Sequence, residues 1–192
     1  NGYDASFLKD INNIKQNFKI LSIGFVGTIY NWHPIKSFLS VVNQLILSKK
    51  INEIRLNFYG INKDFEIRQI INNEYGSLVS KVVFHSKLPN KEMIFKLANN
   101  NLFLLFNDYS ILGTKIYDYL LAKRIILLCF TNDNSAKKLK QKYYSLPDIS
   151  GEFPQKDLIN ITNSGIVVEN QKHLSEIIVN LNNELSNKGY IA

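Results

Sequence analysis

Residues 102–129 read LFLLFNDYSILGTKIYDYLLAKRIILLC, and they indicate the class of fold more clearly than any other part of the chain. The apolar runs at 102–106 and 125–129 have the length and composition of strands that are buried on both faces of a parallel sheet. Between them, a helix is expected to open at Gly113 and Thr114 and to run to Ala122. A buried strand, a helix and a second buried strand indicate a parallel βαβ unit.

The start of this helix has the features of an anion site. A helix N-terminus carries free N–H groups and the positive end of the helix dipole. Lys115, in the first turn, is unfavourable for that dipole, and a bound phosphate would explain it. Asp118 follows at i+3 on the same face, which suits a nucleotide whose diphosphate lies at the helix tip and whose ribose meets the carboxylate. An ordinary ion pair between Lys115 and Asp118 is the alternative.

The rest of the chain repeats this alternation of strand and helix signals. Further strands are expected at 18–26, 55–59, 81–84 and 165–168, a loop at 147–154, and helices beginning near Pro34, Phe65, Asn90, Asn134 and Gln171. We therefore predict an α/β fold in which residues 1–192 form one Rossmann-like domain, with a doubly wound parallel sheet of about six strands and helices on both faces. Ligands of such sheets bind beyond the carboxyl ends of the strands. The loops at those ends are 27–31, 60–63, 85–89 and 107–115.

Composition excludes several classes of protein. With 45% hydrophobic residues the chain can bury a substantial core, but no apolar run reaches the roughly 18 residues of a transmembrane helix. The first residues are polar and include no initiating Met, so we expect the chain to be part of a longer polypeptide. The single cysteine, Cys129, excludes a framework of internal disulfides and fits a reducing compartment.

The net charge of +7 and the pI near 9.3 raise the question of a polyanionic partner. Most of the positive charge is dispersed, and the one dense cluster is Lys137, Lys138, Lys140 and Lys142. We expect this cluster to be a solvated helix face, with contact to an anionic membrane surface or a polyanion as the alternative. No nucleic-acid-binding motif accompanies it, so no nucleic-acid partner is predicted.

The usual cofactor and metal motifs are missing from the sequence. Gly24 and Gly27 do not have the spacing of the dinucleotide fingerprint G-x-G-x-x-G, and no Walker phosphate loop occurs. The histidines lie far apart without partners at ligand spacing, so no metal site is predicted. We expect His33 to cap the helix that follows it and His173 to be a surface residue. His85, at a strand end, is the histidine most able to meet a ligand.

Five segments, in order and with natural spacings, resemble the motifs of a known family. They are NGYD at 1–4, FVGTIY at 25–30, FYG at 58–60, HSKLPNKE at 85–92 and KIYDYLLA at 115–122. Over nearly the whole chain they are similar to the C-terminal, donor-binding half of GT-B glycosyltransferases of the large group-1, or family-four, class.

The resemblance implies a set of donor-binding residues. They are Gly27, Thr28, Leu88, Thr114, Lys115 and Asp118. Asp118 stands where the family binds the ribose hydroxyls of a nucleotide-sugar, and Lys115 with the N–H groups at Thr114 stands where the diphosphate is held. Residues 27–28 would border the diphosphate from the first strand, and the segment at Leu88 would border the base.

This chain departs from the family's pattern at three positions. Asp118 stands where Glu is more common, and Ser110 where many members have a second acidic residue. Thr28 stands where Arg is usual, so the cation clamp on the phosphate is thinner and depends mainly on Lys115.

The resemblance also implies an activity, a partner and a location. The activity is a metal-independent, retaining transfer of a hexose from a nucleoside-diphosphate sugar to an acceptor, without a cofactor, in bacterial polysaccharide or glycoconjugate synthesis. The partner is the N-terminal, acceptor-binding half of the same polypeptide, without which this domain is expected to be inactive. The location is cytoplasmic, with peripheral contact to the inner membrane.

Two other classes of function remain open. One is a non-catalytic nucleotide- or phosphate-binding Rossmann-like module, which Ser110 and Thr28 favour. The other is a flavodoxin-like or receiver-like signalling domain. It would need an acidic cluster after the first strand, and the sequence GTIY at 27–30 offers none.

Overall fold

The computed structural model describes residues 11, 13–17, 19–109, 111–145 and 153–191. Six strands form a sheet in the order β3-β2-β1-β4-β5-β6, and each neighbouring pair is parallel. The strands are β1 (Leu21–Val26), β2 (Ile54–Tyr59), β3 (Val82–His85), β4 (Leu102–Phe106), β5 (Ile125–Cys129) and β6 (Gly165–Val168). This is a doubly wound order, so the predicted Rossmann-like α/β fold is confirmed. The segment at 1–4 and Ser110, which entered the family resemblance, lie outside the described residues.

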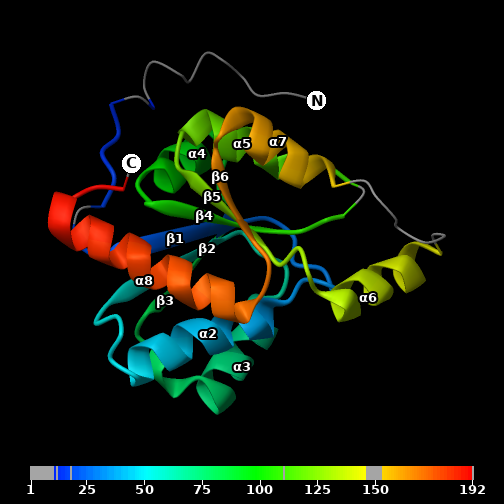
Figure 1. Ribbon diagram of the computed structural model, residues 1–192, viewed down its shortest axis with the longest axis horizontal. Helices are drawn as coiled ribbons and strands as arrows, with labels where there is room; N and C mark the ends of the chain where they lie inside the picture. The colour runs from blue at the N-terminus through cyan, green and yellow to red at the C-terminus, as the bar shows by residue number, and fades with distance from the viewer. Residues whose placement is uncertain (1–10, 12, 18, 110, 146–152, 192) are drawn as a thin grey trace.

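Helices cover both faces of the sheet (Figure 1). They are α2 (Ile35–Leu47), α3 (Asp64–Glu74), α4 (Asn90–Ala98), α5 (Lys115–Ala122), α6 (Asn134–Tyr144), α7 (Pro154–Thr162) and α8 (Gln171–Lys188), with a short 3₁₀ helix, η2 (Gly76–Leu78). In Figure 1, α2, α3 and α8 lie on one side of the sheet, and α4, α5 and α7 lie on the other. Helix α6 stands apart from both layers, beyond the ends of the strands.

The alternation of side chains along β4 explains the two layers. Leu102, Leu104 and Phe106 pack into the core that includes residues of α2 and α8. Phe103 and Leu105 pack into the opposite core, with residues of α4 and α5. Successive side chains of a strand point to opposite faces, so a strand that is apolar at every position needs a helical layer on each side.

Two parts of the chain differ from the expectation. The sequence pattern predicts no helix between the loop at 147–154 and the last strand, whereas helix α7 begins at Pro154. Proline suits the first turn of a helix because the N–H that it lacks has no partner there. The first strand begins at Leu21, so residues 19 and 20 of the expected strand lie outside it, and residue 18 is not among the described residues. No helix in the described part of the chain is both long and apolar enough to span a membrane.

Candidate functional site

A cavity of about 290 Å³ opens at the carboxyl ends of β1 and β4. These strands are neighbours, but β2 and β3 continue the sheet on one side of them and β5 and β6 on the other. Loops that diverge at such a switch point leave the crevice in which Rossmann-like folds bind their ligands. The cavity is lined by Phe25, Tyr30, His33, Leu105, Phe106, Asp108, Ile111, Leu112, Gly113, Thr114, Lys115, Tyr144 and Gln155.

Among these lining residues, Lys115 supplies the positive charge. Its Nζ donates a hydrogen bond of 2.9 Å to the main-chain oxygen of Thr28 and lies 5.0 Å from the ring centre of Phe25. Gly27 makes room for this side chain, because a Cβ at that position would lie 2.7 Å from the Lys115 Cε. Its φ of +90° also favours glycine. The structure therefore brings three of the predicted residues, Gly27, Thr28 and Lys115, into contact.

The beginning of α5 presents main-chain donors at the same wall. Gly113 has φ +72° where the chain turns into the helix, and Thr114 precedes the helix without capping it through its side chain. Within the described residues, the N–H groups of Thr114, Lys115 and Ile116 have no hydrogen-bond acceptor. Such groups carry the positive end of the helix dipole, and they are suited to hold an anion.

Burial changes the proton affinity of Lys115. The loss of hydration lowers the pKa of its ammonium group to about 8, although the charge of Asp108 acts in the opposite direction. A phosphate bound beside Lys115 would stabilise the ammonium form, so protonation and anion binding favour each other. The cavity wall can therefore hold a diphosphate and stabilise charge that develops on it.

Asp118 lies one helical turn beyond Lys115 and is half-buried. Burial raises the pKa of its carboxyl group, which has no hydrogen bond or ion pair within the described residues. Lys115 bonds instead to the oxygen of Thr28, so the alternative of an ion pair between Lys115 and Asp118 is wrong. Asp118 does not line the cavity, and its assignment to ribose stays a prediction.

Leu88 and two of the histidines lie away from this cavity. Leu88, in the loop between β3 and α4, packs against the core on the α4 side, and its assignment to the base stays a prediction. The His85 ring stacks on Tyr59 with 4.4 Å between ring centres. His173 lies in the first turn of α8, where its Nδ1 accepts the main-chain N–H of Glu169.

His33 lines the cavity instead of capping a helix. Helix α2, which is described in full, has no side-chain cap, and the Nδ1 of His33 accepts the main-chain N–H of Tyr30 at 3.3 Å. Burial lowers the pKa of His33 to about 3, and the charges of Lys115, Lys140 and Lys63 act in the same direction. The imidazole is therefore neutral near pH 7.

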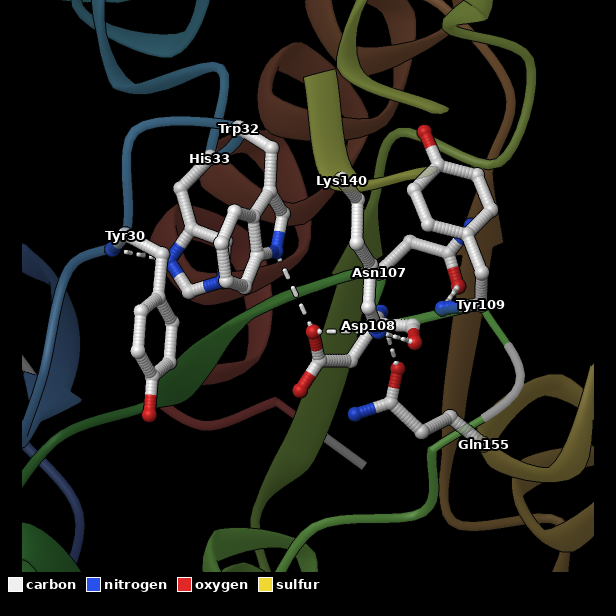
Figure 2. Close-up of polar contacts among 8 residues, drawn as sticks. All are labelled: Tyr30, Trp32, His33, Asn107, Asp108, Tyr109, Lys140 and Gln155. Carbon is white, nitrogen blue, oxygen red and sulfur yellow. Dashed lines mark hydrogen bonds and ion pairs between the residues drawn. The ribbon is translucent and has the colours of Figure 1, made fainter. Parts of the chain in front are cut away.

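Asp108, which the sequence analysis did not single out, organises the loop after β4 (Figure 2). Its carboxylate accepts hydrogen bonds from the Lys140 Nζ at 2.9 Å and from the Trp32 Nε1 at 3.2 Å. Its main-chain oxygen also accepts from Lys140, and its N–H donates to the Gln155 Oε1 at 2.7 Å. These contacts join the loops after β1 and β4 to helices α6 and α7, and they support the cavity wall at 111–115.

The interpretation of the lysine cluster at 137–142 as a solvated helix face is wrong for Lys140. Its side chain is completely buried, and a buried ammonium group needs a counter-charge, which Asp108 supplies. Two sequence signals could have indicated this pair: an acidic residue just after a central strand, and the i,i+4 spacing of Lys140 to the apolar Ala136. Gln155 carries no such signal, because its contact depends on where α7 packs against the loop after β4.

Solved structures share this fold, although no known family model and no curated protein matches the sequence. A variant of S. aureus TarM, in complex with fondaparinux, α-GlcNAc-glycerol and UDP, is 16% identical over 93% of this chain, with a TM-score of 0.59. WaaG, a glycosyltransferase involved in lipopolysaccharide biosynthesis, is 15% identical over 94%, with a TM-score of 0.57. The C-terminal domain of LpcC, a glycosyl transferase group 1 family protein from Francisella tularensis, is 10% identical over 98%, with a TM-score of 0.52.

The extent of these matches differs among the three proteins. This chain spans 33% of the TarM chain and 41% of the WaaG chain, but 90% of the LpcC C-terminal domain. Identities this low show the fold alone. The chain therefore has the Rossmann-like fold that GT-B glycosyltransferases share with UDP-N-acetylglucosamine 2-epimerase.

Proposed function

We propose that this chain is the donor-binding domain of a GT-B glycosyltransferase and that it holds a nucleoside-diphosphate sugar in the cavity between β1 and β4. The observation that carries the proposal is the meeting of the half-buried Lys115 with the N–H groups at the start of α5, which have no acceptor among the described residues, at one wall of that cavity. A fixed cation beside main-chain donors is a site for a diphosphate. The UDP present in the TarM complex supports this class of ligand.

The proposed reaction is the transfer of a hexose from the diphosphate to an acceptor. Negative charge develops on the diphosphate as its bond to the sugar breaks, and Lys115 and the α5 N–H groups would stabilise this charge. The acceptor belongs to an N-terminal half of the same polypeptide, so the present chain is expected to bind donor with little turnover. We further propose that the transfer needs no metal, retains the configuration of the sugar and serves bacterial polysaccharide synthesis at the inner membrane.

A binding screen tests the proposal directly. Calorimetry with the diphosphates of uridine, guanosine and adenosine, and with their sugar conjugates, should identify one base that binds saturably at a single site. Failure of every nucleotide to bind would contradict the proposal.

Replacing Lys115 with methionine is expected to weaken nucleoside-diphosphate binding by about 1.5–3 kcal/mol, the strength of a hydrogen bond to a charged group. Methionine keeps the unbranched chain that passes Gly27 and removes the ammonium group. We expect the variant to fold at least as stably as wild type. Burial lowers the pKa of Lys115 to about 8, so holding its ammonium group in the folded state costs up to about 3 kcal/mol of stability at neutral pH, and methionine removes this cost. Calorimetry and thermal unfolding measure the two effects. Lys50→Met, at an exposed position before β2 and therefore at the opposite edge of the sheet, is the control, and an affinity equal to wild type in Lys115→Met would reject the assignment.

The pH dependence of binding gives an independent check on Lys115. Raising the pH through about 8 removes the proton from the free ammonium group, so the Kd for a nucleotide-sugar should rise by up to about tenfold per pH unit. The phosphates of a nucleotide-sugar stay charged over this range, so the change belongs to the protein. The Lys115→Met variant should bind weakly and with no dependence on pH in this range.

Replacing Asp118 with asparagine is expected to lower the affinity for a ribonucleotide by about 1.5–3 kcal/mol, because a carboxylate accepts from both ribose hydroxyls more strongly than an amide does. Pyrophosphate binding should hold or improve, since it involves no ribose. The fold should be unaffected, because the carboxylate has no hydrogen bond or ion pair within the described residues. A 2′,3′-dideoxynucleotide that binds wild type as tightly as the ribonucleotide would contradict the assignment.

The alternative function is a non-catalytic nucleotide- or phosphate-binding module. The observation that favours it is Thr28, because the loop after β1 offers a main-chain oxygen to Lys115 and no second cation. A donor site should bind one nucleotide-sugar with an affinity that depends on the sugar. A phosphate module should bind pyrophosphate, the free diphosphate and every sugar conjugate alike, and calorimetry separates the two.

A further inference from the structure

The hydroxyl group of Tyr119 lies between the ends of the two central strands. Tyr119, in α5, is completely buried, and its ring stacks on Phe103 of β4 with 4.6 Å between ring centres. Its hydroxyl accepts the main-chain N–H of Val26, at the end of β1, at 3.2 Å. The same hydroxyl donates to the main-chain oxygen of Leu104, in β4, at 3.1 Å. A single side-chain oxygen therefore bridges the main chains of β1 and β4.

The register of the sheet shows which hydrogen bond this hydroxyl replaces. The pairing of β1 with β4 ends where Gly24 lies opposite Phe103. In a parallel ladder, an N–H bonds to the oxygen of the residue that precedes the one opposite. Two residues further along, the N–H of Val26 would therefore bond directly to the oxygen of Leu104. These are the two groups that Tyr119 joins, so its hydroxyl is inserted into the next bond of the ladder.

The inserted hydroxyl keeps the two strands apart where the cavity begins. Two hydrogen bonds in series span a longer distance than the single bond of about 2.9 Å that they replace. Phe25 and Phe106, at the ends of β1 and β4, line the cavity on the far side of this point. The separation of the strands that opens the crevice thus coincides with the place of the Tyr119 hydroxyl.

Tyr119 also belongs to a second contact between α5 and the end of β1. It follows Lys115 by one helical turn, so both side chains leave the same face of the helix. The hydroxyl of Tyr119 holds Val26, and the ammonium group of Lys115 holds the oxygen of Thr28. Helix α5 is therefore fixed against the end of β1 at two residues, with Gly27 between them.

We propose that Tyr119 is a positioning residue of the donor site, and that its hydroxyl holds β1 and β4 apart and so fixes the width of the cavity and the place of the Thr28 oxygen that anchors Lys115. The inference rests on the proposed function. Tyr119 does not line the cavity, so it acts through the main chain and not by contact with the ligand.

Calorimetry on the 192-residue chain, with UDP, GDP and ADP as probes, tests this role. Tyr119→Phe removes only the hydroxyl, and the two main-chain groups can then bond directly and narrow the crevice. The probe that binds wild type should bind this variant more weakly by roughly 10- to 100-fold, the loss expected when Lys115 no longer reaches the phosphate.

Tyr59→Phe is the matched control for the loss of a buried hydroxyl. Tyr59 is 4% exposed and lies outside the cavity. Its hydroxyl also joins two groups, because it accepts from the Asn100 Nδ2 at 3.2 Å and donates to the main-chain oxygen of Lys96 at 3.4 Å. The variant should bind the probe like wild type.

Titration of Lys115 without ligand separates positioning from a general loss of stability. The NMR signal of its Cε should titrate with a midpoint near pH 8 in wild type and in Tyr59→Phe. In Tyr119→Phe the midpoint should fall, because a displaced Thr28 oxygen no longer stabilises the ammonium form.

A measurement on wild type keeps the inference testable if Tyr119→Phe does not fold. The buried hydroxyl proton of Tyr119 should give an NMR cross-peak to the amide proton of Val26. A coupling through a hydrogen bond from the Val26 nitrogen to the Leu104 carbonyl carbon would show a direct bond between the strands and overturn the inference.

The outcomes distinguish the inference from the proposed function. Wild-type affinity in Tyr119→Phe, or an unchanged midpoint for Lys115, overturns the inference and leaves the function standing. Equal weakening in Tyr119→Phe and Tyr59→Phe also overturns it, because the loss would then follow from stability alone. If wild type binds none of the three probes, the proposed function fails, and the inference fails with it.

Discussion

Replacing Lys140 with methionine is expected to lower the free energy of unfolding by about 3–5 kcal/mol, the cost of breaking a buried ion pair. Methionine fills most of the same volume, so the effect reports the lost charge. The carboxylate of Asp108, only 18% exposed, would keep one side-chain donor, the Trp32 Nε1. Domains of this kind are stable by about 5–15 kcal/mol, so denaturant unfolding should show a large shift of the midpoint.

Two further variants identify the cause of this loss. Lys138→Met changes the same residue type on the exposed face of α6 and should alter stability by less than about 0.5 kcal/mol. Adding Asp108→Asn to Lys140→Met removes the unpaired charge, while the amide oxygen can still accept from Trp32. We therefore expect the double variant to lose less stability than the sum of the losses in Lys140→Met and Asp108→Asn. Additive losses would show that the two charges do not act as a pair.

Replacing Gly165 with alanine is expected to destabilise the fold by about 3 kcal/mol, the upper end for overpacking. A Cβ at this position would lie 2.2 Å from the main-chain oxygen of Ile126 and 2.9 Å from its carbonyl carbon. Ile126 is the residue directly opposite Gly165 in β5 and is fully buried, so β6, at the edge of the sheet, has to move instead. Thermal and denaturant unfolding measure the loss.

Gly76→Ala is the matched control for this substitution. A Cβ at Gly76 meets no atom within 4 Å, so the exchange should be neutral or slightly stabilising through the unfolded chain. If the free energies of unfolding of Gly165→Ala and Gly76→Ala differ by less than about 1 kcal/mol, the close approach of β6 to β5 is wrong.

The layers of the fold and one wall of the site could be predicted from local patterns along the chain. The runs at 102–106 and 125–129 are apolar at every position, and such strands are stable only between two helical layers. Gly113, with φ +72°, marks the turn into α5 through a local backbone preference, which depends only on near neighbours along the chain. These features could be predicted because their causes lie within a few residues of sequence.

The side chains that meet at the cavity depend on tertiary contacts, which no local pattern predicts. Lys115 turns toward Thr28 rather than Asp118, and Lys140 is buried against Asp108, 32 residues away in sequence. His33 becomes part of the wall because the loop after β1 borders the crevice where the strand order reverses. Hydrophobic periodicity indicates which face of each element is buried, but it does not indicate which elements become neighbours. The contacts that complete the site depend on which elements are neighbours, so they could not be predicted.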